Sequence, residues 1–266
     1  MSDIKYTPRA PGSITKLGAY EPFELQIARN QITWHSEQNI FAYGTTPATA
    51  GAYRTVWENM ATTDYSFPSS ATTMTLTGGS GDTATITIVG LDANYSPITE
   101  NLALNGATGV TTANAYLRIN SMFVSAGSAT NPANVVTLAN SGTTYAQINT
   151  AVVNGTTGSV GTTQMAVYTV PAGYTFYGYR YGAYSSFNGN SANYTTYRAV
   201  TNVSSGVQRI IVQTPFNTVY EVQRHFPLAY SEKTDLRFQI APSAAAAAVV
   251  SINIGGVLIK NDAGVA

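Results

Sequence analysis

The sequence contains no cysteine, which excludes a disulfide framework, a thiolate metal site and a cysteine nucleophile. Charge is also scarce. Asp, Glu, Lys and Arg make up 10% of the 266 residues, against about 25% in an average soluble domain. The 13 basic and 13 acidic residues balance, and no basic stripe points to a nucleic-acid partner. So little charge gives weak protection against self-association, which favours a subunit whose surface is covered by neighbours.

Long apolar runs are absent as well. No stretch of 18 or more apolar residues predicts a membrane span, so we expect no membrane partner. The first residues, Met1 to Tyr6, lack the charged and apolar blocks of a secretory signal. We therefore expect the chain to be made and used in a cytoplasm without export by that route.

Groups for acid–base catalysis are few. The chain has two histidines, His35 and His225, and no acidic residue between positions 101 and 220. Asp82, Asp92 and Glu100 are close in sequence, but they lack the dense Asp/Asn spacing of a calcium loop. We interpret them as two turn-forming aspartates and a glutamate at a strand edge. The sequence therefore predicts a non-enzymatic protein with no catalytic residues, no cofactor and no metal site.

What the chain does have is a β composition: Thr, Ser, Asn, Gly and 18 tyrosines, with few helix formers. From Tyr53 onward, strand signals recur at the spacing of a sandwich or barrel. The runs at 72–77 and 83–89 alternate apolar and hydroxyl residues, and a glycine-rich loop between them predicts a hairpin. We expect an all-β fold, an antiparallel β-sandwich that is jelly-roll-like, with an extended N-terminal arm.

The positions of proline and glycine divide the chain into three predicted parts. Proline and glycine break residues 1–50, which are predicted to be an extended arm with a short helical turn at 23–29. The arm packs either on its own domain or on a neighbouring subunit. A Gly/Thr-rich stretch at 154–163 then separates a β-unit at 51–160 from a second at 161–266, unless both share one sandwich.

The most distinctive segment runs from Tyr174 to Tyr184, where six of eleven residues are aromatic. Tyr and Arg are enriched at protein interfaces, so this segment predicts a subunit contact. Two other interpretations stay open: a large core, or a carbohydrate site whose tyrosines stack on sugar rings, although the segment itself has no carboxylate. The candidate interface residues, here and in the arm, are Tyr20, Phe23, Trp34, Tyr177, Tyr179, Tyr181 and Tyr184.

Several motifs resemble a known family. They are Glu21-Pro22-Phe23-Glu24-Leu25-Gln26-Ile27-Ala28-Arg29, Asn39-Ile40-Phe41-Ala42-Tyr43-Gly44, Thr55-Val56-Trp57-Glu58, Gly90-Leu91-Asp92-Ala93-Asn94-Tyr95, Ala115-Tyr116-Leu117-Arg118-Ile119-Asn120 and Tyr168-Thr169-Val170-Pro171-Ala172-Gly173-Tyr174-Thr175. With these motifs in this order along the sequence, the chain resembles uncharacterised virion structural proteins of tailed bacteriophages, notably those of marine and cyanobacterial hosts. The family often carries Lys where this chain has Tyr174, so any role of that Lys does not transfer. The resemblance implies a particle component and supplies no catalytic residues.

Composition and resemblance together predict a virion protein, assembled in the host cytoplasm. Our first expectation is an oligomeric decoration or cement subunit on the head. The alternatives are a tail adaptor, fibre or baseplate component, and a carbohydrate-binding module for host recognition. The expected partners are other copies of the chain, the capsid protein first and tail proteins second, with a host glycan as a further possibility.

Overall fold

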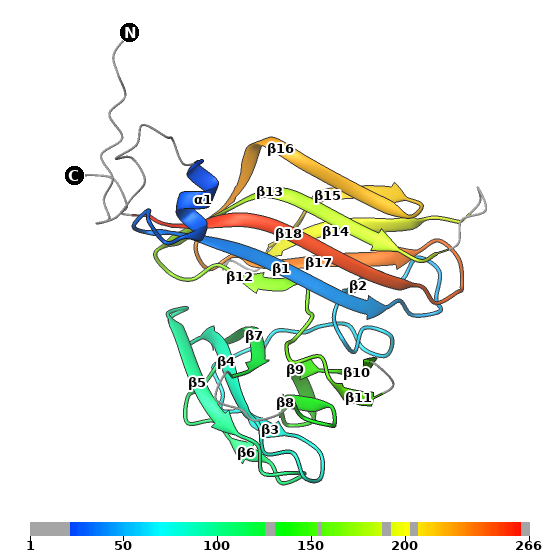
Figure 1. The fold of residues 1–266 in the computed structure, drawn as a ribbon. Coiled ribbons are helices and arrows are strands. Elements are labelled where there is room, and N and C mark those ends of the chain that lie inside the picture. Colours follow the sequence, from blue (N-terminus) through cyan, green and yellow to red (C-terminus); the bar gives the residue numbers. More distant parts are fainter. Residues whose placement is uncertain (1–21, 126–130, 154–155, 188–192, 203–206, 262–266) are drawn as a thin grey trace.

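The computed structural model describes residues 22–125, 131–153, 156–187, 193–202 and 207–261 (Figure 1). One short helix, α1 (Phe23–Ala28), precedes the strands, and every other regular element of the described chain is β. All pairings between these strands are antiparallel. The predicted all-β, antiparallel class is confirmed.

Two sheets are built from both ends of the described chain, and we call them the terminal unit (residues 22–56 and 166–261). One sheet has the order β1 (His35–Thr45), β18 (Val249–Lys260), β13 (Tyr174–Ser185), β16 (Val219–Tyr230). The other has the order β12 (Val167–Thr169), β17 (Asp235–Pro242), β14 (Thr195–Asn202), β15 (Gln208–Phe216), with β2 (Arg54–Thr55) also on β17. Rings from the two sheets meet between them: Tyr168 contacts Phe176, and Tyr181 contacts Phe238.

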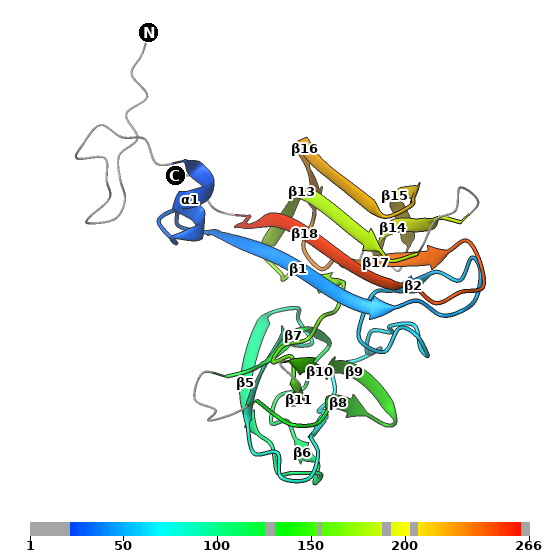
Figure 2. The same ribbon diagram turned by 45° about the vertical axis from the view of Figure 1, so that its right-hand side comes forward.

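Residues 57–165 form a second group of sheets, the inserted unit, which lies below the terminal unit in Figures 1 and 2. One sheet has the order β6 (Val110–Thr111), β3 (Thr75–Thr77), β8 (Val136–Asn140), β9 (Thr143–Ile148). Another has the order β5 (Pro97–Ala103), β4 (Thr85–Leu91), β7 (Arg118–Val124), and β10 (Thr150–Val153) pairs with β11 (Thr156–Ser159). The predicted hairpin between β3 and β4 is wrong, because these strands belong to different sheets.

The inserted unit interrupts a single strand of the terminal unit. Along β17, Gln239 pairs with Thr55 of β2, and Arg237 pairs with Val167 of β12. Phe238, between them, donates its N–H to Ala166 O (3.0 Å) and accepts the N–H of Val56 at its carbonyl (3.1 Å). Ala166 N also donates to Val56 O at 2.7 Å. β2 and β12 are therefore two halves of one strand, and the chain leaves and re-enters it at one point.

The prediction of an extended arm over residues 1–50 is wrong from residue 35 onward. Residues 1–21 lie outside the described part, and residues 23–28 form the expected short helix. This helix ends in a left-handed Asn30 (φ 54°), with Gln31 N donating to Gln26 O, the pattern of a Schellman cap. His35–Thr45 is strand β1, paired along its whole length with β18. The sequence does not predict this strand, because its partner lies more than 200 residues away along the chain.

The strand that carries the aromatic segment, β13, contains a β-bulge. Gly178 pairs with Gly256 of β18 and Arg180 pairs with Gly255, so Tyr179 is an extra residue. Before the bulge the even-numbered Phe176 is buried, and after it the odd-numbered Tyr181 is. A side chain on Gly256 would overlap the Phe176 ring at 2.2 Å, so glycine is needed there to admit that ring.

Candidate assembly interface

The terminal unit has two neighbouring strands, β15 and β16, that each lie at the edge of a sheet. They follow one another in the chain, and Phe216 of β15 contacts Tyr220 of β16. An edge strand leaves one row of backbone N–H and C=O groups unpaired and so offers a template for another chain. We call the two strands the β15–β16 edge.

β16 bulges outward in its middle. Gly178 of β13 pairs with Leu228, whereas Arg180, two residues on, pairs with Gln223, so residues 224–227 have no partner on β13. Phe226, within this bulge, is 87% exposed, the highest value among the large apolar side chains that the structure describes. Burying a phenylalanine side chain stabilises a protein by about 1.5–3 kcal/mol, and most of this stabilisation is missing while Phe226 is exposed. The bulge thus presents an apolar group that a partner could cover.

β15 adds more apolar surface to the same edge. Ile210 is 52% exposed and Ile211 is 38% exposed, and the register shift between Ala199 and Val200 of β14 leaves Ile211 unpaired. Val207, just before the strand, is 53% exposed, and Val219 at the start of β16 is also 53% exposed. Arg209, Glu221 and Arg224 place both signs of charge on these strands. Exposed apolar side chains mixed with a few charges are the composition of an interface.

The predicted interface residues separate into three groups. Tyr20 lies outside the described residues. Phe23 and Trp34 are 48% and 51% exposed next to the start of β1, where Phe23 makes an edge contact with His35 and Lys260 Nζ lies 4.3 Å from the Trp34 ring. Tyr184 is 55% exposed on the outer face of β13, and Tyr177 and Tyr179 are partly exposed.

The prediction that Tyr181 lies at an interface is wrong. Its side chain is 2% exposed, and its hydroxyl lies 3.1 Å from the Tyr230 hydroxyl inside the terminal unit. Burial, together with the neighbouring Tyr230, raises the pKa of Tyr181 well above its usual value. The bulge at Tyr179 reverses the facing of the strand, so Tyr181 points inward and belongs to the core.

The edge and bulge residues Ile210, Ile211 and Phe226 did not stand out in the sequence. Phe226 follows Arg224 and His225 and precedes Pro227, which is an unusual composition for a strand. Proline removes a backbone donor and is confined to edge strands or bulges within sheets. That proline is the one sequence signal that could have identified β16 as an edge.

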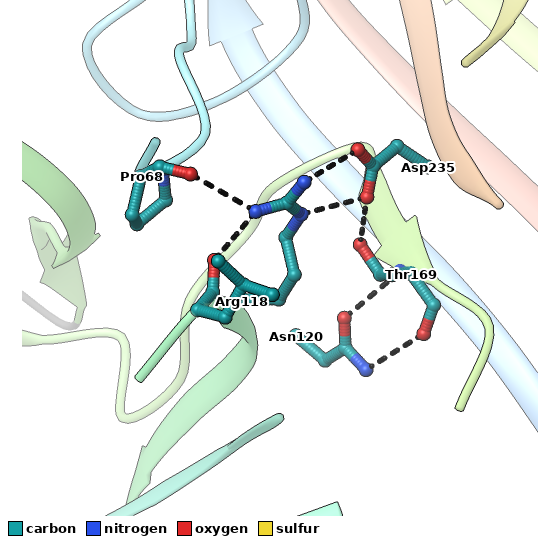
Figure 3. Close-up of polar contacts among 6 residues, drawn as sticks. Pro68, Arg118, Asn120, Thr169 and Asp235 are labelled. Carbon is teal, nitrogen blue, oxygen red and sulfur yellow. Dashed lines mark hydrogen bonds and ion pairs between the residues drawn. The ribbon is translucent and has the colours of Figure 1, made fainter. Parts of the chain in front are cut away.

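The two units are joined by a buried ion pair (Figure 3). Arg118 of β7 binds Asp235 of β17 through two contacts, Nε–Oδ1 at 2.7 Å and Nη2–Oδ2 at 2.9 Å. Its Nη1 donates to the carbonyls of Pro68 (3.0 Å) and Leu117 (2.7 Å). Thr169 Oγ1 also donates to Asp235, at 2.7 Å. A bidentate pair in which nearly every donor is satisfied fixes the relative position of the units.

A pocket of about 440 Å³ lies at the same junction, between β1, β12 and strands β4 and β7. Leu91, Met165, Tyr168 and Tyr174 supply apolar surface, and Asn39 and Ser121 supply polar groups. Among the described residues that line the pocket, none is a carboxylate, a histidine, an arginine or a lysine.

The three acidic residues considered for metal binding serve the backbone. Asp82 accepts the N–H groups of Gly79 and Ala133, and although burial opposes it, these hydrogen bonds lower its pKa. Asp92 accepts those of Asn94 and Ser96, and Glu100 of β5 accepts those of Ala113 and Asn114. The interpretation as turn and strand-edge residues is confirmed. Within the described ranges no group of three His, Cys, Asp or Glu residues is placed to hold a metal ion.

No protein-family model matches the chain, and no curated protein does. The chain is similar to a structure of the infectious bursal disease virus Gx strain at 11% identity, over 92% of this chain and 78% of the viral one, with a TM-score of 0.25. A mutant VP2 protein of the same virus, in T=1 particles, matches at 10% identity over 86% and 71% with a TM-score of 0.26. TM-scores this low do not establish a shared fold. No helix in the described part of the chain is long and apolar enough to cross a membrane.

Proposed function

We propose that the protein is a structural subunit of a virus particle and that its terminal unit is a jelly roll. If β1 and β12 to β18 are numbered one to eight, one sheet has the order 1-8-3-6 and the other 2-7-4-5. This is the strand order of an eight-stranded jelly roll, an architecture used by capsid proteins, lectins and cupins. The inserted unit then occupies a break in the second strand. Because the fold serves several functions, the function must be argued from the surface.

The observation that carries the proposal is the exposed apolar β15–β16 edge. An unprotected edge strand is an aggregation hazard in a lone soluble protein and is normally blunted by charge or covered. Here it carries Ile210, Ile211 and Phe226 in a chain with only 10% charged residues. A partner that covers this edge removes the hazard, and repeated contacts of this kind add up across a particle.

The finer placement that we propose is a decoration or cement subunit on the head of a tailed phage, bound to the capsid protein and to other copies of itself. The motif resemblance to tailed-phage virion proteins supports it, as does the low charge. A tail adaptor, fibre or baseplate component is the alternative, because the same edge could pack a ring or a fibre. Copy number distinguishes these placements: a decoration subunit is present in many copies over the head and a tail part in few.

The test combines light scattering with sedimentation. The molar mass of the purified protein is measured alone, and the protein is then mixed with empty phage heads and pelleted. We expect an oligomer, and pelleting at a stoichiometry comparable to the capsid protein. A stable oligomer that stays in the supernatant would move the placement to the tail, and a monomer that binds no particle component would contradict assembly altogether.

Charge placed on the edge should weaken assembly. Phe226→Asp and Ile210→Lys leave the core untouched, because both side chains face solvent in the isolated chain. We expect each to reduce oligomer mass or head binding without lowering the melting temperature. Val135→Asp is the matched control, since Val135 is a 39% exposed apolar residue of the inserted unit. If it impairs assembly as much as Phe226→Asp does, the edge is not the contact.

A further inference from the structure

The outer face of the sheet β1-β18-β13-β16 carries exposed aromatic side chains apart from the β15–β16 edge. In one row across the sheet, Tyr43 pairs with Ser251, Ser251 with Tyr184, and Tyr184 with Val219. Residues paired across strands point to the same face. The burial patterns agree, because the residues adjacent to Tyr43, Ser251 and Tyr184 along their own strands are buried. This sheet faces the viewer in Figure 1, with the inserted unit below it.

Two aromatic walls stand on this face. Phe41 and Tyr43 project from β1 and are 44% and 46% exposed, and Tyr184 projects from β13 and is 55% exposed. One strand, β18, separates β1 from β13, so the backbones under Tyr43 and Tyr184 are about 9–10 Å apart. A sugar ring that contacts an aromatic ring on each of its two faces needs about 7–8 Å between those aromatic rings. A single pyranose ring fits between the walls.

Small and polar residues form the floor between these walls. Ser251 lies between Tyr43 and Tyr184, and in the next row the order is Phe41, Asn253, Gly182. Asn253 Oδ1 accepts a hydrogen bond from Arg180 Nη2 at 3.0 Å, which leaves the Asn253 amide nitrogen available as a donor. The floor can therefore exchange hydrogen bonds with hydroxyl groups.

Gly182 is not required by the fold. A Cβ built there would come no closer than 3.4 Å to its surroundings, and the residue is not among the glycines with positive φ. Its effect is to leave the outer surface between Asn253 and Glu221 without a side chain. This open position adjoins both the aromatic walls and a carboxylate.

The fold supplies the carboxylate that the aromatic segment lacks. Glu221 of β16 pairs with Gly182 and is exposed on the outer face. A carboxylate accepts two hydroxyl hydrogen bonds and is a strong acceptor for a sugar diol. Aromatic walls, an amide floor and an adjacent carboxylate are complementary to a polyhydroxylated ring with apolar C–H faces.

We propose that this aromatic face, made of Phe41, Tyr43, Tyr184, Gly182, Glu221 and Asn253, binds a neutral carbohydrate chain. The pyranose C–H groups pack on the rings of Tyr43 and Tyr184, and the hydroxyl groups bind Glu221 and Asn253. Only Glu221 of this site lies on β16; the aromatic walls and the floor lie on β1, β13 and β18, away from the β15–β16 edge. In a particle with many copies, weak single sites add up to firm attachment to a cell-surface polysaccharide.

The test titrates the whole protein with neutral hexose hexamers, namely maltohexaose, cellohexaose and mannohexaose, by calorimetry and by NMR. We expect at least one to bind in the millimolar range and Tyr184→Ala to weaken it about tenfold. Gly182→Val should abolish binding while the fold is retained, because valine suits a strand and its Cβ would come no closer than 3.4 Å to its neighbours. Phe226→Ser is the matched control and should bind sugar like the unaltered protein.

Two results would overturn the proposal. One is that none of the three hexamers gives heat in calorimetry or shifts in NMR, and the other is sugar binding that Tyr184→Ala and Gly182→Val leave unchanged. If in the second case the two variants also lower the molar mass by light scattering, this face is a contact between copies. Because oligomer mass and sugar binding are measured separately, failure of this site leaves the test of the β15–β16 edge intact.

Discussion

At the residue scale, the buried carboxyl of Glu58 links stability to pH. It follows the point where the chain leaves the terminal unit, and its Oε1 accepts the N–H of Gln164, close to where the chain returns. Its Oε2 and the Tyr65 hydroxyl are buried and make no hydrogen bond with the described residues. Burial raises the pKa of the Glu58 carboxyl to about 8, opposed by the hydrogen bond from Gln164. The folded protein therefore holds a proton here that the unfolded chain releases above pH about 4.5.

Stability should consequently fall as the pH rises through the titration of Glu58. Below pH about 4.5 the carboxyl is protonated in both the folded and the unfolded chain, so it does not change the free energy of unfolding. As the pH rises from about 4.5 to about 8, the free energy of unfolding falls by on the order of 3–5 kcal/mol. Glu58→Gln should remove this loss, so urea unfolding at pH 8 should show a more stable variant than the unaltered protein, with little difference at pH 4.5. Glu37→Gln, an exposed glutamate of β1, is the control. Equal pH dependence in both variants would rule out Glu58 as the cause.

At the scale of elements, the bulge in β13 determines which aromatic residues are core and which are surface. Tyr179 is the extra residue, and the pairs on either side of it, Gly178–Gly256 and Arg180–Gly255, are consecutive on β18. Deleting Tyr179 should therefore restore a regular strand with Phe176 and Tyr181 still facing inward. We expect this deletion to fold with a modest change in melting temperature by circular dichroism. Deleting Asn253 from β18, which has no bulge, should abolish folding, because it reverses the facing of every later residue.

Sequence reasoning identified the elements better than their partners. The alternation in 83–89 predicts a strand where β4 (Thr85–Leu91) lies, and the helical turn at 23–29 corresponds to α1. The partners were unpredictable because strand pairing is set by long-range burial: β3 joins β8 and β4 joins β7, instead of each other. At the candidate sites, Tyr184 could be singled out as an aromatic. Glu221 and Phe41 could not, because only the register of β1 and β16 brings them beside it.

At the scale of the whole molecule, the interrupted strand predicts that the terminal unit can exist alone. Val56 and Ala166 both lie opposite Phe238, so Ala166 is removed together with the inserted unit. Joining Val56 to Val167 then places Val56 opposite Phe238 and Val167 opposite Arg237, with no break in register. We expect this shortened chain to fold cooperatively with β-rich circular dichroism. It should be less stable than the full chain, because the burial of Trp57, Met60 and Tyr65 is lost. A chain that remains unfolded would show that the terminal unit depends on the inserted one.

The junction between the units should depend strongly on its ion pair. Arg118→Met leaves Asp235 buried without its partner, and breaking a buried pair in this way costs about 3–5 kcal/mol. Urea unfolding should show that loss, and the double variant Arg118→Met, Asp235→Leu should recover most of it, because both buried charges are then gone. If the double variant is no more stable than the single one, the packing around the guanidinium, including Phe67 at 4.8 Å from Arg118 Cζ, accounts for the loss.

The pairing of β1 with β18 also determines when the protein can fold during its synthesis. His35 pairs with Ile259, and β18 lies between β1 and β13, so this sheet stays incomplete until residue 260 has left the ribosome. The strands of the inserted unit pair over much shorter spans, and local contacts form sooner. The inserted unit should therefore fold first on the nascent chain. The sheet that holds β16 closes last, and a growing subunit has no finished edge with which to bind its neighbours too early.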